Sequence, residues 1–488
     1  MYDAILVGGG HNGLVTAAYL AKAGRRVLVL ERRDVIGGAC VTEPLWPGYR
    51  ISTASYVVSL LLPEVVRDLE LAKFGYEVLP RNPSSFTPLL DGRSLLMGAD
   101  QAATVKAIAE FSPADAEAYP RYERLLERIA EVIEPVLSQT PPDLLPLPKP
   151  WRTVGWMDRL KQFRQGYTMW QSLDGLGLDL PEAIEFLTGA ARPILDRWFE
   201  SDVLKSTLAT DAIIGTFQPI SAAGTAYVLL HHVMGMAGGA RGVWGYVSGG
   251  MGRLSEAIAK SAETHGAEIR TNADVAEILV EQGRAVGVRL ADGSREAARV
   301  VISNADANVT FNRLLQPGLL PEPFAAAISR LDYSSASMKI NLGVSELPDF
   351  TCRPGHETPQ PHHRGTIHIG TGLDYLERAY DEAKYGRPSS QPIIEMTIPS
   401  SVDDSLAPPG KHVISLFVQY APYRLVGGDW ESLRESYADV CIDTIGRYAP
   451  NFPESIEHRQ VLTPVDIERV FGLTGGNIFQ GSMVPHQM

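Results

Sequence analysis

A glycine-rich turn between two short apolar runs near the N-terminus limits the possible folds of this chain more than any other feature. Ala4–Val7 has the composition of a buried strand, and the turn Gly8–Gly13 follows it directly. Leu14–Ala23 is apolar on nearly all sides, as in a buried helix, and Val27–Leu30 is a second strand-like run that ends at Glu31. The order strand, G-x-G-x-x-G, helix, strand, acid predicts a dinucleotide-binding βαβ unit.

Each residue type in this unit has its own physical reason. Gly8 allows the tight turn out of the strand, Gly10 lets the backbone approach a diphosphate, and Gly13 lets the helix lie close to the sheet. Free N–H groups and the dipole at the helix start favour a diphosphate there. The Glu31 carboxylate is suited to accept hydrogen bonds from a ribose diol and would repel a 2′-phosphate. The glycine doublet Gly37-Gly38, six residues after Glu31, resembles the FAD fingerprint of glutathione-reductase-like flavoproteins.

Composition excludes several classes of protein. The chain has 488 residues, 45% of them hydrophobic and 21% charged, which excludes a disordered or coiled-coil chain. The net charge of −13 and the lack of a basic tract argue against nucleic-acid binding. The three cysteines, Cys40, Cys352 and Cys441, are far apart, so there is no CxxC pair and no zinc knuckle. We expect a cytoplasmic protein with at most peripheral, hydrophobic membrane contact.

The later part of the chain predicts a second portion of the same nucleotide-binding domain. Gly249–Gly252 precedes a predicted helix over 254–265, and four predicted strands follow between Ala267 and Ser303, two of them in antiparallel hairpins. We therefore predict an α/β fold: a discontinuous glutathione-reductase-like, Rossmann-type FAD-binding domain with an inserted α+β substrate domain. The predicted limits are 1–70 plus 230–312 for the first domain and 71–229 plus 313–470 for the second.

An aromatic and methionine-rich segment lies just after a stiff connector with five prolines at 141–150. Core packing is the favoured interpretation of this segment, and a membrane-facing lip or an entrance for an apolar substrate is the alternative. Its members are Trp151, Trp156, Met157, Phe163, Met169 and Trp170.

Nearly the whole chain resembles the phytoene-desaturase-related FAD oxidoreductases. The segments that show this are GGGHNGL (8–14), GGACVTEPLWPGY (37–49), ASYVVSLL (54–61), AYVLLHHVMG (226–235) and GVWGYVSGGMG (242–252). The resemblance implies a non-covalently bound FAD. The residues that it places on the diphosphate, on the adenosine ribose or adenine, or along the path to the flavin are Gly8, Gly10, His11, Asn12, Gly13, Glu31, Arg32, Gly37, Gly38, Ala39 and Val275.

The resemblance also implies a closing element after the segment Gly472–Phe479: a final strand and a glycine-rich helix start that cover the flavin. The chain ends at Met488 before such an element. We therefore expect the C-terminal closing element to be missing and the ADP half of the site to be more complete than the flavin half.

Three residues are candidates for catalysis. In related amine-oxidising flavoproteins a lysine lies near the flavin, and Lys339, in a strand-like apolar run, is the matching candidate; a lysine at a strand edge is the alternative. His231 and His232 lie in an apolar helix-like run and are either acid/base groups or structural histidines. We expect no metal site, because His356, His362 and His363 lack ligand spacing, and we expect Cys40 to be a small buried thiol.

These features predict an FAD-dependent oxidoreductase that dehydrogenates or isomerises an apolar, polyene-like substrate by hydride transfer to the flavin. No second G-x-G-x-x-G unit and no CxxC pair is present, which disfavours a pyridine-nucleotide-driven reductase. Molecular oxygen or a quinone would then reoxidise the flavin. One alternative is an FAD amine or alicyclic oxidase with a small substrate, and another is a non-catalytic or truncated nucleotide-binding relative. The sequence does not assign an oligomeric state.

Overall fold

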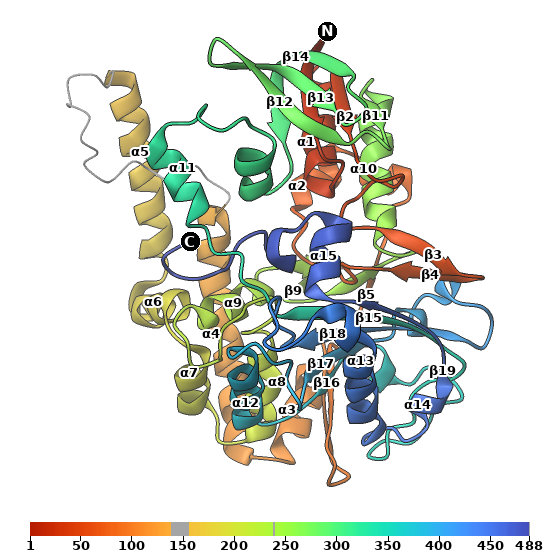
Figure 1. Ribbon diagram of the computed structural model, residues 1–488. Helices are drawn as coiled ribbons and strands as arrows, with labels where there is room; N and C mark the ends of the chain where they lie inside the picture. Colours follow the sequence, from red (N-terminus) through yellow and green to blue (C-terminus); the bar gives the residue numbers. More distant parts are fainter. Residues whose placement is uncertain (138–155, 238–239, 488) are drawn as a thin grey trace.

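Two large sheets and a group of helices make up the molecule (Figure 1). The structure, a computed structural model, describes residues 1–137, 156–237 and 240–487. In the view of Figure 1 one sheet lies at the top with the N-terminus, the other lies below it, and most helices of the segment 101–233 lie to the side of the lower sheet.

The upper sheet has six strands in the order β11-β2-β1-β14-β13-β12. The first four are parallel, whereas β13 and β12 join by antiparallel pairing. The strands are β1 (Tyr2–Val7), β2 (Val27–Leu30), β11 (Glu268–Arg270), β12 (Val275–Glu281), β13 (Arg284–Leu290) and β14 (Arg295–Ser303). The antiparallel addition to a parallel sheet is the arrangement that the sequence predicts.

Two helices cover one face of this sheet, α1 (His11–Lys22) and α10 (Gly252–Thr264). The buried residues of α1 are mostly small, including Gly13, Ala17 and Ala18, so that α1 lies close to both the sheet and α10. Every residue of β2 is buried, as expected for a strand in the interior of a parallel sheet.

The lower sheet has seven strands in the order β19-β15-β18-β17-β16-β6-β7, and only the β16–β6 pair is parallel. Every residue of β15 is buried, but the two faces of the strand differ. Met338, Ile340 and Leu342 face an apolar core, whereas Lys339 and Asn341 alternate with them on the other face. The strands are β6 (Ser85–Pro88), β7 (Ser94–Met97), β15 (Ser337–Val344), β16 (Thr366–Ile369), β17 (Ile393–Thr397), β18 (His412–Gln419) and β19 (Ile456–Leu462). Smaller pairs are β3 (Thr42–Trp46) with β4 (Tyr49–Ser52), and β5 (Val78–Pro80) with β10 (Gly245–Val247).

The helical group forms a core of its own beside the lower sheet. Side chains cap two of its helices: Asp100 accepts from the Ala103 N–H (3.1 Å) at the start of α3, and the Ser112 hydroxyl accepts from the Asp115 N–H (3.1 Å) at the start of α4. Its helices are α3 (Gln101–Ala109), α4 (Pro113–Leu137), α5 (Trp156–Asp174), α6 (Leu180–Thr188), α7 (Ala191–Trp198), α8 (Asp202–Thr210) and α9 (Thr225–Val233). Three further helices are α12 (Leu373–Ala383), α13 (Trp430–Gly446) and α15 (Pro464–Phe471).

The structure contradicts the core interpretation of the aromatic segment. In α5, Trp156, Met157, Phe163 and Trp170 are all more than half exposed. Trp151 and the proline-rich run 141–150 lie outside the described residues. The segment has the right residue types for a core, but Trp156, Phe163 and Trp170, seven residues apart, form an exposed row along the helix.

The fold is therefore a Rossmann-type FAD-binding fold combined with a second, mixed α/β portion, as predicted. The strands of the upper sheet come from residues 2–30 and 268–303, and those of the lower sheet from 85–97 and 337–462. The chain thus passes from the upper sheet to the lower one, returns to the upper sheet, and then passes to the lower sheet again. The exact domain limits stay a prediction.

Candidate FAD-binding and active site

The glycine-rich turn lies where the carboxyl ends of three parallel strands meet. Gly8 follows β1, Glu31 follows β2 and Asn304 follows β14, and ligands of such sheets bind at this edge. Gly8 has φ +95°, a conformation that favours glycine. A Cβ atom on Gly10 would lie 2.7 Å from Asn304 Nδ2, and one on Gly13 would lie 2.5 Å from the Gly8 carbonyl oxygen. At Gly13 the close contact is with backbone, so only glycine fits there, whereas a larger residue at Gly10 would have to displace the end of the Asn304 side chain.

The N-terminus of α1 differs from that of α10, although both follow glycine runs. No side chain caps α1, and its first turn has no acidic residue. At α10, in contrast, Ser52 accepts from the Met251 N–H (3.0 Å) and Thr42 accepts from the Gly252 N–H (2.8 Å). Of these two helices, α1 is therefore the one whose first N–H groups have no side-chain acceptor. Its N-terminus is suited to bind a diphosphate.

Glu31 holds the glycine turn in place from the end of β2. Its carboxylate accepts hydrogen bonds from the Gly9 N–H (2.7 Å) and from the Arg33 N–H (2.9 Å), and the side chain is only 5% exposed. Each carboxylate oxygen has a second lone pair, so a ribose hydroxyl still has acceptors here. The predicted ribose contact is compatible with this geometry.

Four other predicted contacts lie around this acid. Gly37 donates its N–H to the Gly9 carbonyl oxygen (2.8 Å), so the glycine doublet lies against the turn, and the Ala39 carbonyl oxygen accepts from the Ser55 N–H (3.0 Å). A Cβ on Gly38 would lie 3.3 Å from Gly10 Cα. Ala273, two residues before Val275, donates its N–H to the Glu31 carbonyl oxygen (2.8 Å).

The other predicted FAD contacts, Arg32, His11 and Asn12, differ from one another in their surroundings. Arg32 donates Nη2 to the carbonyl oxygens of Arg469 (3.1 Å) and Val470 (2.7 Å), near the C-terminus of α15, where a cation is favourable. His11 is the first residue of α1, and burial lowers the pKa of its imidazole. Asn12, next to it, is exposed.

A buried group of ionisable side chains lies on the lower sheet, and we name it the Lys339 cluster. It consists of Tyr56, Arg81, Asp211, Lys339, His368 and Glu395. Lys339, on β15, is 3% exposed; its ammonium donates to the Ser415 hydroxyl and lies 4.3 Å from the centre of the Tyr56 ring. Burial lowers the pKa of Lys339 to about 7, and it raises the pKa of Tyr56 well above its usual value. Lys339 is thus buried in the sheet, not placed at a strand edge in solvent.

Glu395, on β17, is the second unusual group in the Lys339 cluster. It is 5% exposed, and its Oε1 has no hydrogen-bond partner within the described part of the chain. The nearest cation-forming group is His368 Nδ1 at 3.8 Å, but burial lowers the pKa of that histidine to about 3, so it is neutral near pH 7. Burial, with a contribution from Asp211, raises the pKa of Glu395 to about 8.

Arg81 and Asp211 complete the Lys339 cluster. Arg81 donates Nη1 to the Thr366 hydroxyl and lies 5.9 Å from the centre of the Tyr246 ring, while its Nε has no partner among the described residues. Burial raises the pKa of Asp211 to about 6, although Arg81 opposes the shift. The cluster therefore contains an unpaired buried acceptor on Glu395 and an unpaired buried donor on Arg81, both available to a polar ligand or to water.

The two candidate histidines lie on α9. His232 donates Nδ1 to the Val228 carbonyl oxygen (2.7 Å) and stacks on Trp244 (5.5 Å between ring centres). His231 contacts Phe479 edge to face (6.2 Å), and its Nδ1 has no partner among the described residues. Burial lowers the pKa of each to about 4. The contacts of His232 are those of a structural histidine.

His362, His363 and Cys40, which the sequence analysis also considered, are buried side chains. His362 and His363 lie in the core against Phe350. Cys40 is buried, and burial raises its thiol pKa to about 11. Within residues 1–137, 156–237 and 240–487, no group of three or more His, Cys, Asp or Glu side chains is arranged to hold a metal ion.

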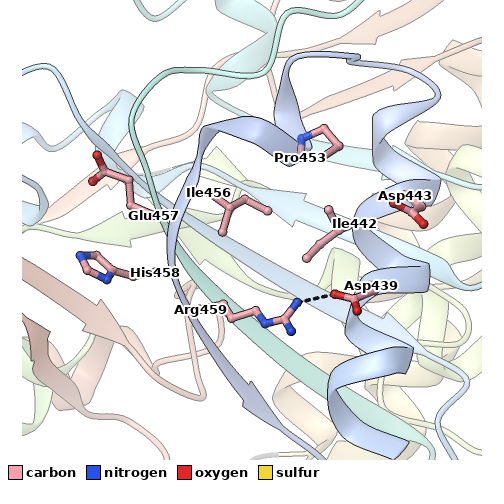
Figure 2. Close-up of a pocket in the computed structure, with 8 residues that line it drawn as sticks. All are labelled: Asp439, Ile442, Asp443, Pro453, Ile456, Glu457, His458 and Arg459. Atoms are coloured by element: carbon pink, nitrogen blue, oxygen red, sulfur yellow. Dashed lines mark hydrogen bonds and ion pairs between the residues drawn. The ribbon is translucent and has the colours of Figure 1, made fainter.

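A surface pocket of about 460 Å³ lies between α13 and β19 (Figure 2). Arg459 points across it to Asp439 (2.5 Å), whereas Glu457 and His458 point the other way. Glu457 forms an ion pair with Lys411 (2.6 Å). The charges of this pocket are largely paired with one another, so the pocket offers less to a substrate than the Lys339 cluster does.

The comparison with protein families decides the assignment. The family described as flavin containing amine oxidoreductase matches residues 13–422, which is most of the chain. The chain belongs to this family. It is an FAD-dependent oxidoreductase, and the uncapped α1 and the glycine turn are suited to hold the cofactor.

Curated relatives match along the whole chain. Pyridine nucleotide-disulfide oxidoreductase domain-containing protein 2 of Rattus norvegicus is 47% identical over 100% of this chain and 85% of its own length. One of the limonene dehydrogenase polypeptides of Castellaniella defragrans is 27% identical over 100% of this chain and 86% of its own, and phytoene desaturase of Fusarium fujikuroi is 26% identical over 97% and 79%. The resemblance to phytoene-desaturase-related proteins is confirmed.

Among solved structures, a mutant of putrescine oxidase covers 94% of this chain and 84% of its own with a TM-score of 0.55 and 17% identity. An oxidoreductase from Methanosarcina mazei has the same TM-score at 16% identity and covers 94% and 87%. These similarities show the fold. The name of the rat relative mentions disulphides, but here Cys40, Cys352 and Cys441 are all free thiols.

Sequence reasoning missed Asn304 and most of the Lys339 cluster. A weak signal was present for Glu395 and His368, since each is an ionisable residue inside a short apolar strand, Ile-Ile-Glu-Met and Ile-His-Ile. Arg81 and Asp211 lie in loops far apart in the sequence, and only the fold brings them together.

Proposed function

We propose that this flavoprotein dehydrogenates an apolar, polyene-like organic substrate. The observation that supports the proposal is Lys339, a buried lysine with a pKa of about 7 beside the Tyr56 ring. The assignment of the chain as an FAD-dependent oxidoreductase is independent of this choice of substrate.

Formation of a C=C bond by dehydrogenation removes a hydride from one carbon and a proton from its neighbour, so it requires an acceptor for the hydride and a base for the proton. FAD, when bound, supplies the hydride acceptor. Near pH 7 about half of the Lys339 amine is neutral, so the side chain is able to take up a proton from a neighbouring carbon as the C=C bond forms. The Tyr56 phenol keeps its proton and orients the lysine through its ring.

Two findings favour an apolar substrate. Limonene dehydrogenase and phytoene desaturase, whose names specify hydrocarbons, are similar to this chain along nearly its full length. Beside Lys339, Tyr56 also contacts the ring of Phe417 (6.4 Å between ring centres), so an apolar surface adjoins the base.

A second candidate is an amine oxidase. The carboxyl groups of Asp211 and Glu395 favour it, because both could accept hydrogen bonds from a substrate ammonium group and Asp211 is largely ionised near pH 7. Arg81 opposes this interpretation, since its guanidinium already balances the charge of Asp211. The hydrocarbon substrate is the first choice for this reason.

Flavin reduction under anaerobic conditions separates the candidates. The purified chain is first saturated with FAD and passed over a desalting column, and the bound flavin is measured at ~450 nm. Terpene and polyene hydrocarbons are then compared with aliphatic mono- and diamines for bleaching of the flavin. Bleaching by hydrocarbons supports the proposal, and bleaching by amines alone refutes it in favour of the amine oxidase.

Two variants and two acceptors complete the test. Lys339→Met is expected to retain FAD and to bleach about 100-fold more slowly. Lys205→Met, which changes a lysine of the helical group, should retain FAD and bleach at the unmodified rate. Equal bleaching in both variants would refute the role of Lys339. Admission of oxygen or of a soluble quinone after bleaching then identifies the electron acceptor. A chain that retains no FAD would favour the non-catalytic alternative.

A further inference from the structure

Five large apolar side chains form one exposed row along α5. Their positions, Trp156, Leu160, Phe163, Tyr167 and Trp170, are spaced alternately by four and three residues, which places them on one side of a helix. Each is between 50% and 76% exposed. A contiguous exposed row of this kind marks an interaction surface, whereas single exposed apolar residues do not.

The row is free because α5 is attached to the molecule at its C-terminal end. Leu173 packs against the helical core, Leu176 is fully buried, and Arg128 donates to the Gly175 carbonyl oxygen (3.0 Å). In Figure 1, α5 lies at the outer margin of the molecule. Tyr167 and Trp170 stack on one another (6.0 Å), so the aromatic rings contact each other within the row.

We propose that the α5 row docks on the surface of a lipid bilayer with anionic headgroups. The row contains two tryptophans, a tyrosine and a phenylalanine, and amphipathic aromatic rings of this kind concentrate at the boundary between headgroups and acyl chains. The helices of the described ranges include none that is both long and apolar enough to cross a bilayer. The contact is therefore peripheral, and it does not depend on the proposed substrate.

Local charge favours an anionic surface. The chain as a whole has a net charge of −13, yet residues 156–170 contain three basic residues and one acid. Lys161 and Arg164 are exposed. A basic polar face next to an aromatic apolar face is typical of helices that lie in the membrane interface, and each basic residue near such a surface adds attraction.

The same charges disfavour a second copy of the chain as the partner. The 4-3 spacing would also suit a coiled-coil seam, whose flanking positions normally carry complementary charges. The described flanking residues here are Met157, Arg164 and Gln171 on one side and Gly166 and Leu173 on the other. None of them is acidic, so a partner α5 would offer no countercharge to Arg164.

Vesicle co-flotation with the full chain tests the proposal. The vesicles are pure phosphatidylcholine or phosphatidylcholine with about 30 mol% phosphatidylglycerol. We expect binding to the anionic vesicles, and the double variant Phe163→Glu/Trp170→Glu is expected to bind at least about tenfold more weakly. The matched control is Tyr385→Glu, which replaces an aromatic residue that is 69% exposed outside α5 and should bind like the unmodified chain.

A second pair of substitutions tests the role of charge. Lys161→Gln/Arg164→Gln should weaken binding to the anionic vesicles and leave any binding to neutral vesicles unchanged. Far-ultraviolet circular dichroism and the melting temperature confirm that each variant is folded. The proposal is overturned if the unmodified chain fails to float, if Tyr385→Glu weakens binding as much as the α5 variant, or if the chain is a dimer that Phe163→Glu/Trp170→Glu dissociates.

Discussion

Replacement of Lys339 by methionine should stabilise the protein near pH 7 and destabilise it near pH 10. Burial lowers the pKa of Lys339 from 10.5 to about 7, so the folded chain pays a penalty for the charged form. Above about pH 10.5 the lysine is neutral in both states and the penalty is absent. It grows as the pH falls and is complete below about pH 7, where it amounts to about 5 kcal/mol.

Methionine removes this penalty but also removes two favourable contacts. Loss of the contact with the Tyr56 ring costs about 1–2 kcal/mol while the lysine is charged. Loss of the hydrogen bond leaves the Ser415 hydroxyl without its donor and costs about 1–3 kcal/mol. The net result is a gain of up to about 2 kcal/mol at pH 7 and a loss of up to about 2 kcal/mol near pH 10, where about 1 kcal/mol of the penalty still remains. For a chain of 488 residues, 1 kcal/mol corresponds to a shift in melting temperature of about 1 °C.

Urea denaturation of the unmodified and variant chains at pH 7 and pH 10 measures this reversal. Lys205→Met is the control: burial lowers the pKa of Lys205, but ion pairs with Asp196 (2.7 Å) and Asp202 (3.4 Å) raise it more. That lysine is charged in the folded chain, so its removal should destabilise the protein at both pH values. A Lys339→Met chain that is less stable than the unmodified one at pH 7 would refute the reasoning, because it would show that the site favours the charged lysine.

Three further predictions concern the substitution of Gly13, Glu31 and Glu395. Gly13→Ala places a Cβ 2.5 Å from the Gly8 carbonyl oxygen, so it should destabilise the fold by about 1–3 kcal/mol and weaken FAD binding, as measured by melting and by FAD titration. Glu31→Ala leaves the Gly9 N–H without its acceptor and should raise the dissociation constant for FAD by at least about tenfold; unchanged flavin occupancy would contradict the placement of the cofactor. Burial raises the pKa of Glu395 from 4.5 to about 8, so the contribution of this carboxyl to stability should fall as the pH rises from about 4.5 to 8. The stability of the unmodified chain relative to Glu395→Gln should fall over this range, and a difference that does not change with pH would exclude a raised pKa of Glu395.

The nucleotide-binding part of the fold could be predicted because its signals are local. The strand, the glycine turn, the helix and Glu31 lie within the first 31 residues, and each has a backbone reason that holds in any fold. The predicted antiparallel strands from Val275 to Ser303 have turn residues at their ends, and the structure has them as β12 to β14. The role of Arg32 at the end of α15 had no such signal, because the two segments are more than 400 residues apart.

The Lys339 cluster and the exposed α5 row could not be predicted for two different reasons. The cluster joins side chains from strands and loops between Tyr56 and Glu395, and their proximity depends on the pairing order of the lower sheet. The α5 row was visible in the sequence as aromatic residues, but periodicity alone does not tell a buried face from one that waits for a partner. The exposed fractions of these side chains in the structure show that the α5 row lies on the surface.

The energetics of the Lys339 cluster argue that it is a functional site. Lys339, Asp211 and Glu395 all have pKa values displaced by burial toward neutral pH, and each displacement lowers the stability of the fold in part of the pH range. Well-packed apolar residues at the same positions would avoid this cost. The glycine turn, by contrast, costs little beyond backbone entropy and determines only where the nucleotide binds. In this cluster the chain therefore gives up stability for groups that exchange protons near pH 7, as the proposed dehydrogenation requires.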